Sequence, residues 1–166
     1  MSLANLQLPP IVLQQLFKQS LVSLKNHEVK TSSTKSTKLS VLGNNGKHIA
    51  ILVACEKALY LPDDQLNFLV GILSACGLTM EDVSILNIRK NDSVNYLLLN
   101  AELNCKTILL FGVSADEIEL PLNFPAYQVQ KFNNQVYLVA PQLIDLQKDK
   151  SEKSKLWNCL KQIFSV

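Results

Sequence analysis

The sequence contains little histidine and no paired cysteine motif. Its only histidines are His27 and His48, and no CxxC pair or histidine at ligand spacing accompanies its four cysteines, which are Cys55, Cys76, Cys105 and Cys159. This pattern excludes the common zinc-finger and thioredoxin-like motifs. We therefore expect reduced, mostly buried thiols, as in an intracellular protein, and no bound metal.

Strong charge of either sign and long apolar runs are also missing. Charged residues make up 18% of the chain and the net charge is +2, whereas a purely electrostatic nucleic-acid binder is usually more basic. No apolar run approaches the roughly 20 residues of a membrane span, and no charged region precedes an apolar stretch at the N-terminus. We expect a cytoplasmic protein without membrane contacts, built as one domain with an appendage.

The appendage is predicted to be an amphipathic helix within residues 1–28. Pro9 and Pro10 suit a helix start, because the amide hydrogens that proline lacks would be unpaired there anyway. A single apolar stripe then follows at helical spacing, formed by Leu13, Leu16, Phe17, Leu21 and Leu24. Two interpretations remain open: the stripe packs on the protein's own core, or it binds a partner.

Residues 29–47 are predicted to be a flexible linker. They are rich in Ser, Thr, Lys, Gly and Asn and have few apolar side chains to bury. The lysines of this segment would be solvated or would contact phosphates.

Residues 48–166 have the pattern of an α/β domain. An apolar run at 49–54 predicts a strand buried on both faces. A helix follows, capped by Asp63 or Asp64 and ended by Gly77, and a second strand is expected at 83–88 after a turn that pairs Thr79 with Asp82. The inward residues expected for this helix are Leu66, Leu69, Val70 and Leu73.

The second half of the domain continues the alternation of helix and strand. A helix is predicted at 94–104 and a strand at 106–113, and a C-terminal helix is capped by Ser151. The runs 127–132 and 135–140 predict a hairpin, or else the second run is a fourth parallel strand. The expected fold is a three-layer α/β/α sandwich with a mainly parallel four-stranded sheet.

Several segments, ILVACEK, GLTMEDVSILNIRK, CKTILLFGV and APQLIDLQ, together resemble the uracil-DNA glycosylase superfamily in the right order. The resemblance covers residues 48–166 and implies that fold. On the family's motifs, Glu56 matches the acidic residue of the first loop and Asn87 the asparagine that reads uracil, although LLLN at 97–100 is a rival for the second match. The glycines of the first loop are absent here, and Ala140 replaces the catalytic histidine of the late motif.

The resemblance therefore implies a vestigial pocket without catalytic residues or cofactor, formed by Cys55, Glu56, Asn87, Ala140 and Pro141. The C-terminal pattern, with Pro141, Leu-x-Asp-Leu and Leu-Trp, is similar to that of the psi subunits of bacterial DNA polymerase III. This likeness implies a non-catalytic replication subunit whose N-terminal helix binds the clamp loader. Its globular domain would bind a chi-like subunit, so that any association with DNA is indirect.

Alternatives from other classes remain. A divergent glycosylase would use Glu56 and Asn87. A small-molecule-binding or purely structural α/β domain predicts a formed pocket next to Glu56, and an apolar, filled cleft there would argue against it. Trp157 is expected to be either a core residue or an anchor of an interface.

Overall fold

The computed structural model describes residues 38–166, which form one compact unit. The predicted N-terminal helix lies outside the described residues, and so do its partner-binding candidates and residues 29–37 of the predicted linker. Those candidates are Leu13, Leu16, Phe17, Leu21 and Leu24.

A mixed sheet of six strands organises the described residues, so the prediction of an α/β fold is confirmed and the four-stranded sheet was too small. The strands run in the order β1-β3-β2-β4-β6-β5. The inner four are mutually parallel, and the outermost strand at each edge is antiparallel to its neighbour. Their bounds are β1 Val41–Leu42, β2 Ile49–Val53, β3 Val83–Asn87, β4 Thr107–Phe111, β5 Val129–Phe132 and β6 Gln135–Ala140.

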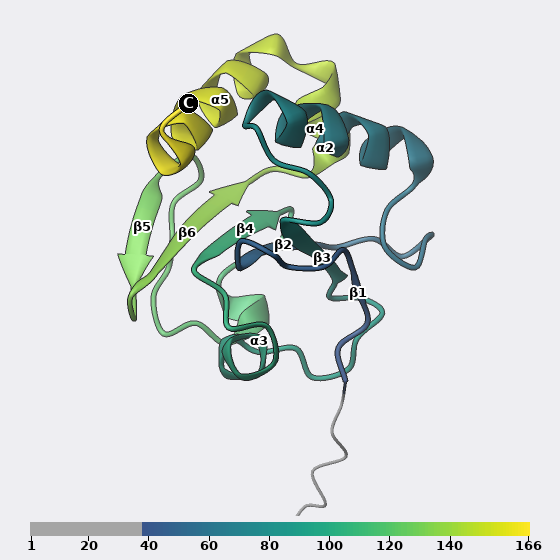
Figure 1. The fold of residues 1–166 in the computed structure, drawn as a ribbon, viewed down its shortest axis with the longest axis vertical. Coiled ribbons are helices and arrows are strands. Elements are labelled where there is room, and N and C mark those ends of the chain that lie inside the picture. The colour runs from purple at the N-terminus through teal and green to yellow at the C-terminus, as the bar shows by residue number, and fades with distance from the viewer. Residues whose placement is uncertain (1–37) are drawn as a thin grey trace, which may run out of the picture. The chain divides into compact units, whose positions relative to one another are not determined.

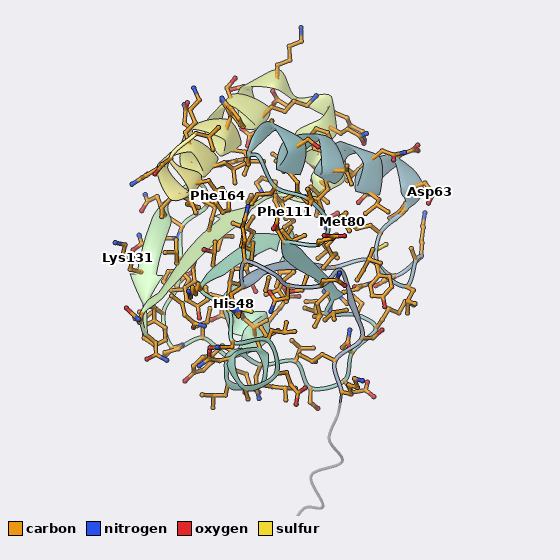
Figure 2. The ribbon with its side chains drawn as sticks, in the orientation of Figure 1. His48, Asp63, Met80, Phe111, Lys131 and Phe164 are labelled. Atoms are coloured by element: carbon orange, nitrogen blue, oxygen red, sulfur yellow. The ribbon has the colours of Figure 1, made fainter. Side chains whose placement is uncertain are left out.

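Helices cover both faces of the sheet and give three layers (Figure 1). On one face lie α2 (Asp63–Ala75), α4 (Leu143–Lys148) and α5 (Lys150–Phe164), and on the other lies α3 (Tyr96–Leu103) with the short 3₁₀ helix η1 (Asp116–Ile118). Every residue of β2, β3 and β4 is buried, because side chains alternate between two apolar cores. Figure 2 shows side chains filling both spaces between the layers.

Helix ends differ in detail from the predictions. Neither Asp63 nor Asp64 caps α2; both lie in its first turn, where carboxylates favour the positive end of the helix dipole. The cap of α5 is Asp149, whose side chain accepts a hydrogen bond from the Ser151 amide at 2.7 Å, so Ser151 is not the cap. Val70 is 37% exposed, so it does not face inward with Leu69 and Leu73 as predicted. Helix α4 was not predicted.

The predicted turns are confirmed. Gly77 follows α2 with a φ of 67°, a conformation that glycine adopts without strain. Asp82 accepts hydrogen bonds from the backbone amide and the hydroxyl of Thr79, at 2.9 and 3.2 Å. Lys47 pairs with the same carboxylate at 3.4 Å.

The domain begins before residue 48, where the linker prediction had placed its start. Strand β1 falls inside the predicted linker and pairs with β3. The Asn45 side chain also donates to the carbonyl of Leu103 at 2.6 Å. A two-residue strand has no measurable periodicity, which explains why composition alone assigned it to a linker.

Both interpretations of the last two strands are correct at once. β5 and β6 form an antiparallel hairpin, and β6 also pairs in parallel with β4. Asn133 and Asn134 join them with φ angles of 49° and 63°, as a type I′ turn requires.

Candidate functional site

A cleft of about 570 Å³ opens at the carboxyl ends of the parallel strands. The chain leaves β2 toward β3 on one side, and it leaves β4 toward β6 on the other. In open α/β sheets, ligands bind at such a reversal of strand order. The lining comes from the segments after β2, β3, β4 and β6 and from the first turn of α2: Ala54, Cys55, Glu56, Lys57, Pro62, Asp64, Gln65, Arg89, Gly112, Gln142, Ile144 and Gln147.

Asn87, the last residue of β3, is fully buried behind this cleft and holds the loop that follows β2. Its side-chain oxygen accepts hydrogen bonds from the amides of Cys55 at 3.0 Å and Arg89 at 3.1 Å. Its side-chain nitrogen lies 2.6 Å from the carbonyl oxygen of Cys55, 3.1 Å from that of Ala58 and 3.2 Å from that of Leu59. An amide offers two hydrogens and two lone pairs, so none is left for a ligand. Asn87 therefore satisfies backbone groups.

The charged groups of the cleft lie at its rim. Glu56 and Lys57 are exposed there, while Cys55 is half-buried. The Arg89 guanidinium donates to a carboxylate oxygen of Glu117 at 2.9 Å, and so it is already held in place. The rim thus presents both signs of charge, with no strong field of one sign.

The late loop fills the side of the cleft next to β6. Ala140 is buried and Pro141 is half-buried. Gln142 lies over Gly112, where an added Cβ would come within 2.3 Å of the Gln142 Cγ. The structure thus places all five predicted pocket residues at this end of the sheet, but it brings only Cys55 and Glu56 into the lining.

Sequence reasoning missed Arg89, Gln142 and Gln147 as lining residues. The first two follow the ends of β3 and β6, so their positions were available once those strands were predicted. Gln147 lies on α4, the helix that was not predicted.

His48 lies at the far end of the sheet, immediately before β2, while Phe111 closes the carboxyl end of β4; both are labelled in Figure 2. The Nδ1 atom of His48 is buried without a hydrogen-bond partner among the described residues. His27 is outside those residues. The described part of the chain therefore supplies no imidazole to the cleft.

The cysteines also lie apart from any shared site. Cys76, Cys105 and Cys159 are buried as predicted, and each carries a free thiol. Burial raises the pKa of Cys105 to about 12 and raises that of Cys76. Within residues 38–166, no group of three or more His, Cys, Asp or Glu side chains could hold a metal ion, and no helix is long and apolar enough to cross a membrane.

A second concave surface, which we call the α2–α5 groove, lies between those two helices and has a volume of about 470 Å³. Trp157 is half-buried there and packs against the core, while its role as an anchor of an interface stays a prediction. The lining is mostly apolar: Asn67, Phe68, Gly71, Ile72, Ala75, Lys153, Leu156, Trp157 and Leu160.

Two surfaces of residues 38–166 are therefore candidates for binding. The cleft has both polar and apolar groups in its lining, and Asn87 behind it is already engaged by the backbone, whereas the α2–α5 groove is mostly apolar and open. No protein-family model matches this chain, and no curated protein matches it at a significant level.

Proposed function

We propose that this protein is a non-catalytic subunit of a DNA-replication assembly, similar to the psi subunits of DNA polymerase III, that joins partner proteins through its surfaces. The observation that carries the proposal is the saturated side chain of Asn87, the residue that the sequence resemblance matches to the base-reading asparagine of the glycosylases. The parallel sheet with this asparagine at the end of β3 supports a uracil-DNA glycosylase-like ancestry, which is also a proposal.

Base reading by Asn87 would require it to release the backbone of the first loop. The amide and carbonyl of Cys55 would then lose their partners, and each unpaired buried group costs about 1–3 kcal/mol. A glycosylase also polarises the base through a histidine, and Ala140 offers no side-chain hydrogen bond. Both points favour a role without chemistry.

The exposed apolar surface favours a role in binding. Aromatic side chains in apolar depressions are the usual anchors of protein interfaces, and Trp157 has this setting. In the proposal, the predicted N-terminal helix binds the clamp loader and the globular domain binds a further, chi-like subunit. Contact with DNA is then indirect.

Capture of partners by the tagged full-length protein from native lysate tests the proposal, with quantitative mass spectrometry as the readout. We expect clamp-loader subunits to be enriched over an untagged control. A Phe17→Ser variant should lose this enrichment, whereas Leu97→Ser, which alters an exposed leucine of α3, should keep it. Absence of every clamp-loader and replication protein from the captured set would exclude the proposal.

A second candidate function is binding of a small molecule in the cleft. The formed pocket beside Glu56, which this hypothesis required, favours it. Thermal shifts of the full-length protein with a panel of nucleobases and nucleotides test it, with Glu56→Gln as the matched variant. A shift that this variant does not alter would argue against a site at Glu56.

Release of base from uracil-containing DNA tests the glycosylase alternative, for which we expect no activity above that of Asn87→Ala.

A further inference from the structure

The side chains at the bottom of the α2–α5 groove are buried, whereas those along its sides are partly exposed to solvent. Leu156 and Leu160, which form the floor, are 2% and 1% exposed. Phe68, Ile72 and Trp157 are only half-buried and flank them. When a partner covers large apolar side chains that contact solvent, the burial of their surface stabilises the complex.

Gly71 lies in the middle of α2 and opens the groove further. Glycine weakens a helix interior relative to alanine, so its presence there needs a reason. No packing reason exists among the described residues, since a Cβ at this position would meet nothing within 4 Å. On the same side of α2, Asn67 and Ala75 are exposed, with no bulky side chain between them. The backbone of α2 is therefore accessible to another helix at close range.

The charge along the groove is positive. The ammonium nitrogen of Lys153 lies 5.3 Å from the ring centroid of Phe68, and that of Lys161 lies 5.5 Å from the ring centroid of Trp157. Neither lysine forms an ion pair within residues 38–166, whereas Lys155, on the same helix, pairs with Glu152 at 2.7 Å. Between residues 65 and 75, α2 has no charged side chain that would offset them.

We propose that the α2–α5 groove binds an amphipathic helix of a partner protein. Large apolar side chains of that helix enter beside Gly71 and Trp157, and its flanking carboxylates meet Lys153 and Lys161. A helix laid in an apolar groove is a common mode of recognition, in which charges at the rim set the choice of partner. This assignment rests on the proposed binding function and names the kind of partner that one of its surfaces takes.

Two synthetic 18-residue peptides test the charge preference. Both carry the same leucine stripe at helical spacing and no tryptophan; one has glutamate and the other has lysine on the flanks. Because Trp157 is the only tryptophan, its fluorescence reports binding to the full-length protein, and titration calorimetry gives Kd. We expect the glutamate peptide to bind at least about tenfold more tightly, and the double variant Lys153→Glu, Lys161→Glu to reverse the order. Equal affinity for both peptides would overturn the proposal.

A leucine at position 71 tests the location. Gly71→Leu fills open space in the groove, so we expect an unchanged or higher Tm together with at least a tenfold weaker affinity for the glutamate peptide. Ser74→Leu adds the same side chain to an exposed position of α2 outside the groove lining, and it should bind like the wild type. Wild-type affinity in Gly71→Leu would overturn the groove assignment.

Lysate capture with the same variants separates this inference from the proposed function. If Gly71→Leu captures clamp-loader and replication proteins as the wild type does, without loss of any of them, the groove assignment fails and the proposed function stands. If the peptides behave as expected but no replication protein is captured, the proposed function fails and the groove assignment stands.

Discussion

Replacement of Asn87 by alanine is the sharpest test of its structural role. The change removes the acceptor for the amides of Cys55 and Arg89 and the donor for three carbonyl groups. The carbonyl of Leu59 belongs to a residue that is 59% exposed, so water can replace the lost donor there. The amide and carbonyl of Cys55 make part-buried hydrogen bonds, and at about 1–3 kcal/mol each they set the scale of the loss.

The expected loss is therefore about 3 kcal/mol of the free energy of unfolding, which is a large share of the 5–15 kcal/mol typical of a domain. For a domain of this size such a loss lowers Tm by about 10 °C. Urea unfolding followed by Trp157 fluorescence measures it.

Asn158→Ala serves as the control, because this exposed asparagine of α5 makes no side-chain hydrogen bond within residues 38–166 and should change stability by less than about 0.5 kcal/mol. Asn87→Asp keeps the shape and the acceptor but turns a carboxylate oxygen toward the carbonyls, so it should be destabilised as well. A loss below about 1 kcal/mol in Asn87→Ala would refute the reasoning. The side chain would then be dispensable to the loop and available to a ligand.

Three further predictions follow from packing and burial. Gly112→Ala places a Cβ against Gln142 at a φ of 65°, and it should lower the free energy of unfolding by about 2 kcal/mol in urea titrations. Gly71→Ala, the matched change in open space within a helix, should instead raise it by about 0.5–1 kcal/mol; a loss there would show that the position is crowded. Burial raises the pKa of both Tyr137 and Cys105 to about 12. The folded state therefore holds these protons after the unfolded state has released them, and stability should fall as pH rises from about 9 to 12. A midpoint of urea unfolding that stays constant over this range would contradict the last prediction.

The sequence was sufficient for the central strands and the main helices, because these elements have the strongest patterns. Runs such as 49–53 and 107–111 are apolar throughout, as strands covered on both faces require. The shortest elements were harder to predict. β1 is two residues long, and α4 is only six residues long, too short to show a helical period.

The location of the cleft could be predicted from the sequence, but the hydrogen bonds that engage Asn87 could not. Its location follows from topology alone, since loops after parallel strands gather at one end of the sheet. The engagement of Asn87 depends on the path of residues 55–59, which no local pattern encodes. The role of Gly71 was equally hidden, because an exposed helical glycine differs from a structural one only in what lies around it in space.

The antiparallel strands at the two margins of the sheet have a consequence for how this protein assembles. β1 offers only two residues, and β5 only four, including the exposed Lys131. Short margins with a lysine give another chain little backbone to pair with, and they protect folded proteins from fibrous aggregation. Complexes formed by the domain of residues 38–166 should therefore be built by side-chain contacts and not by pairing of backbones at the margins of its sheet.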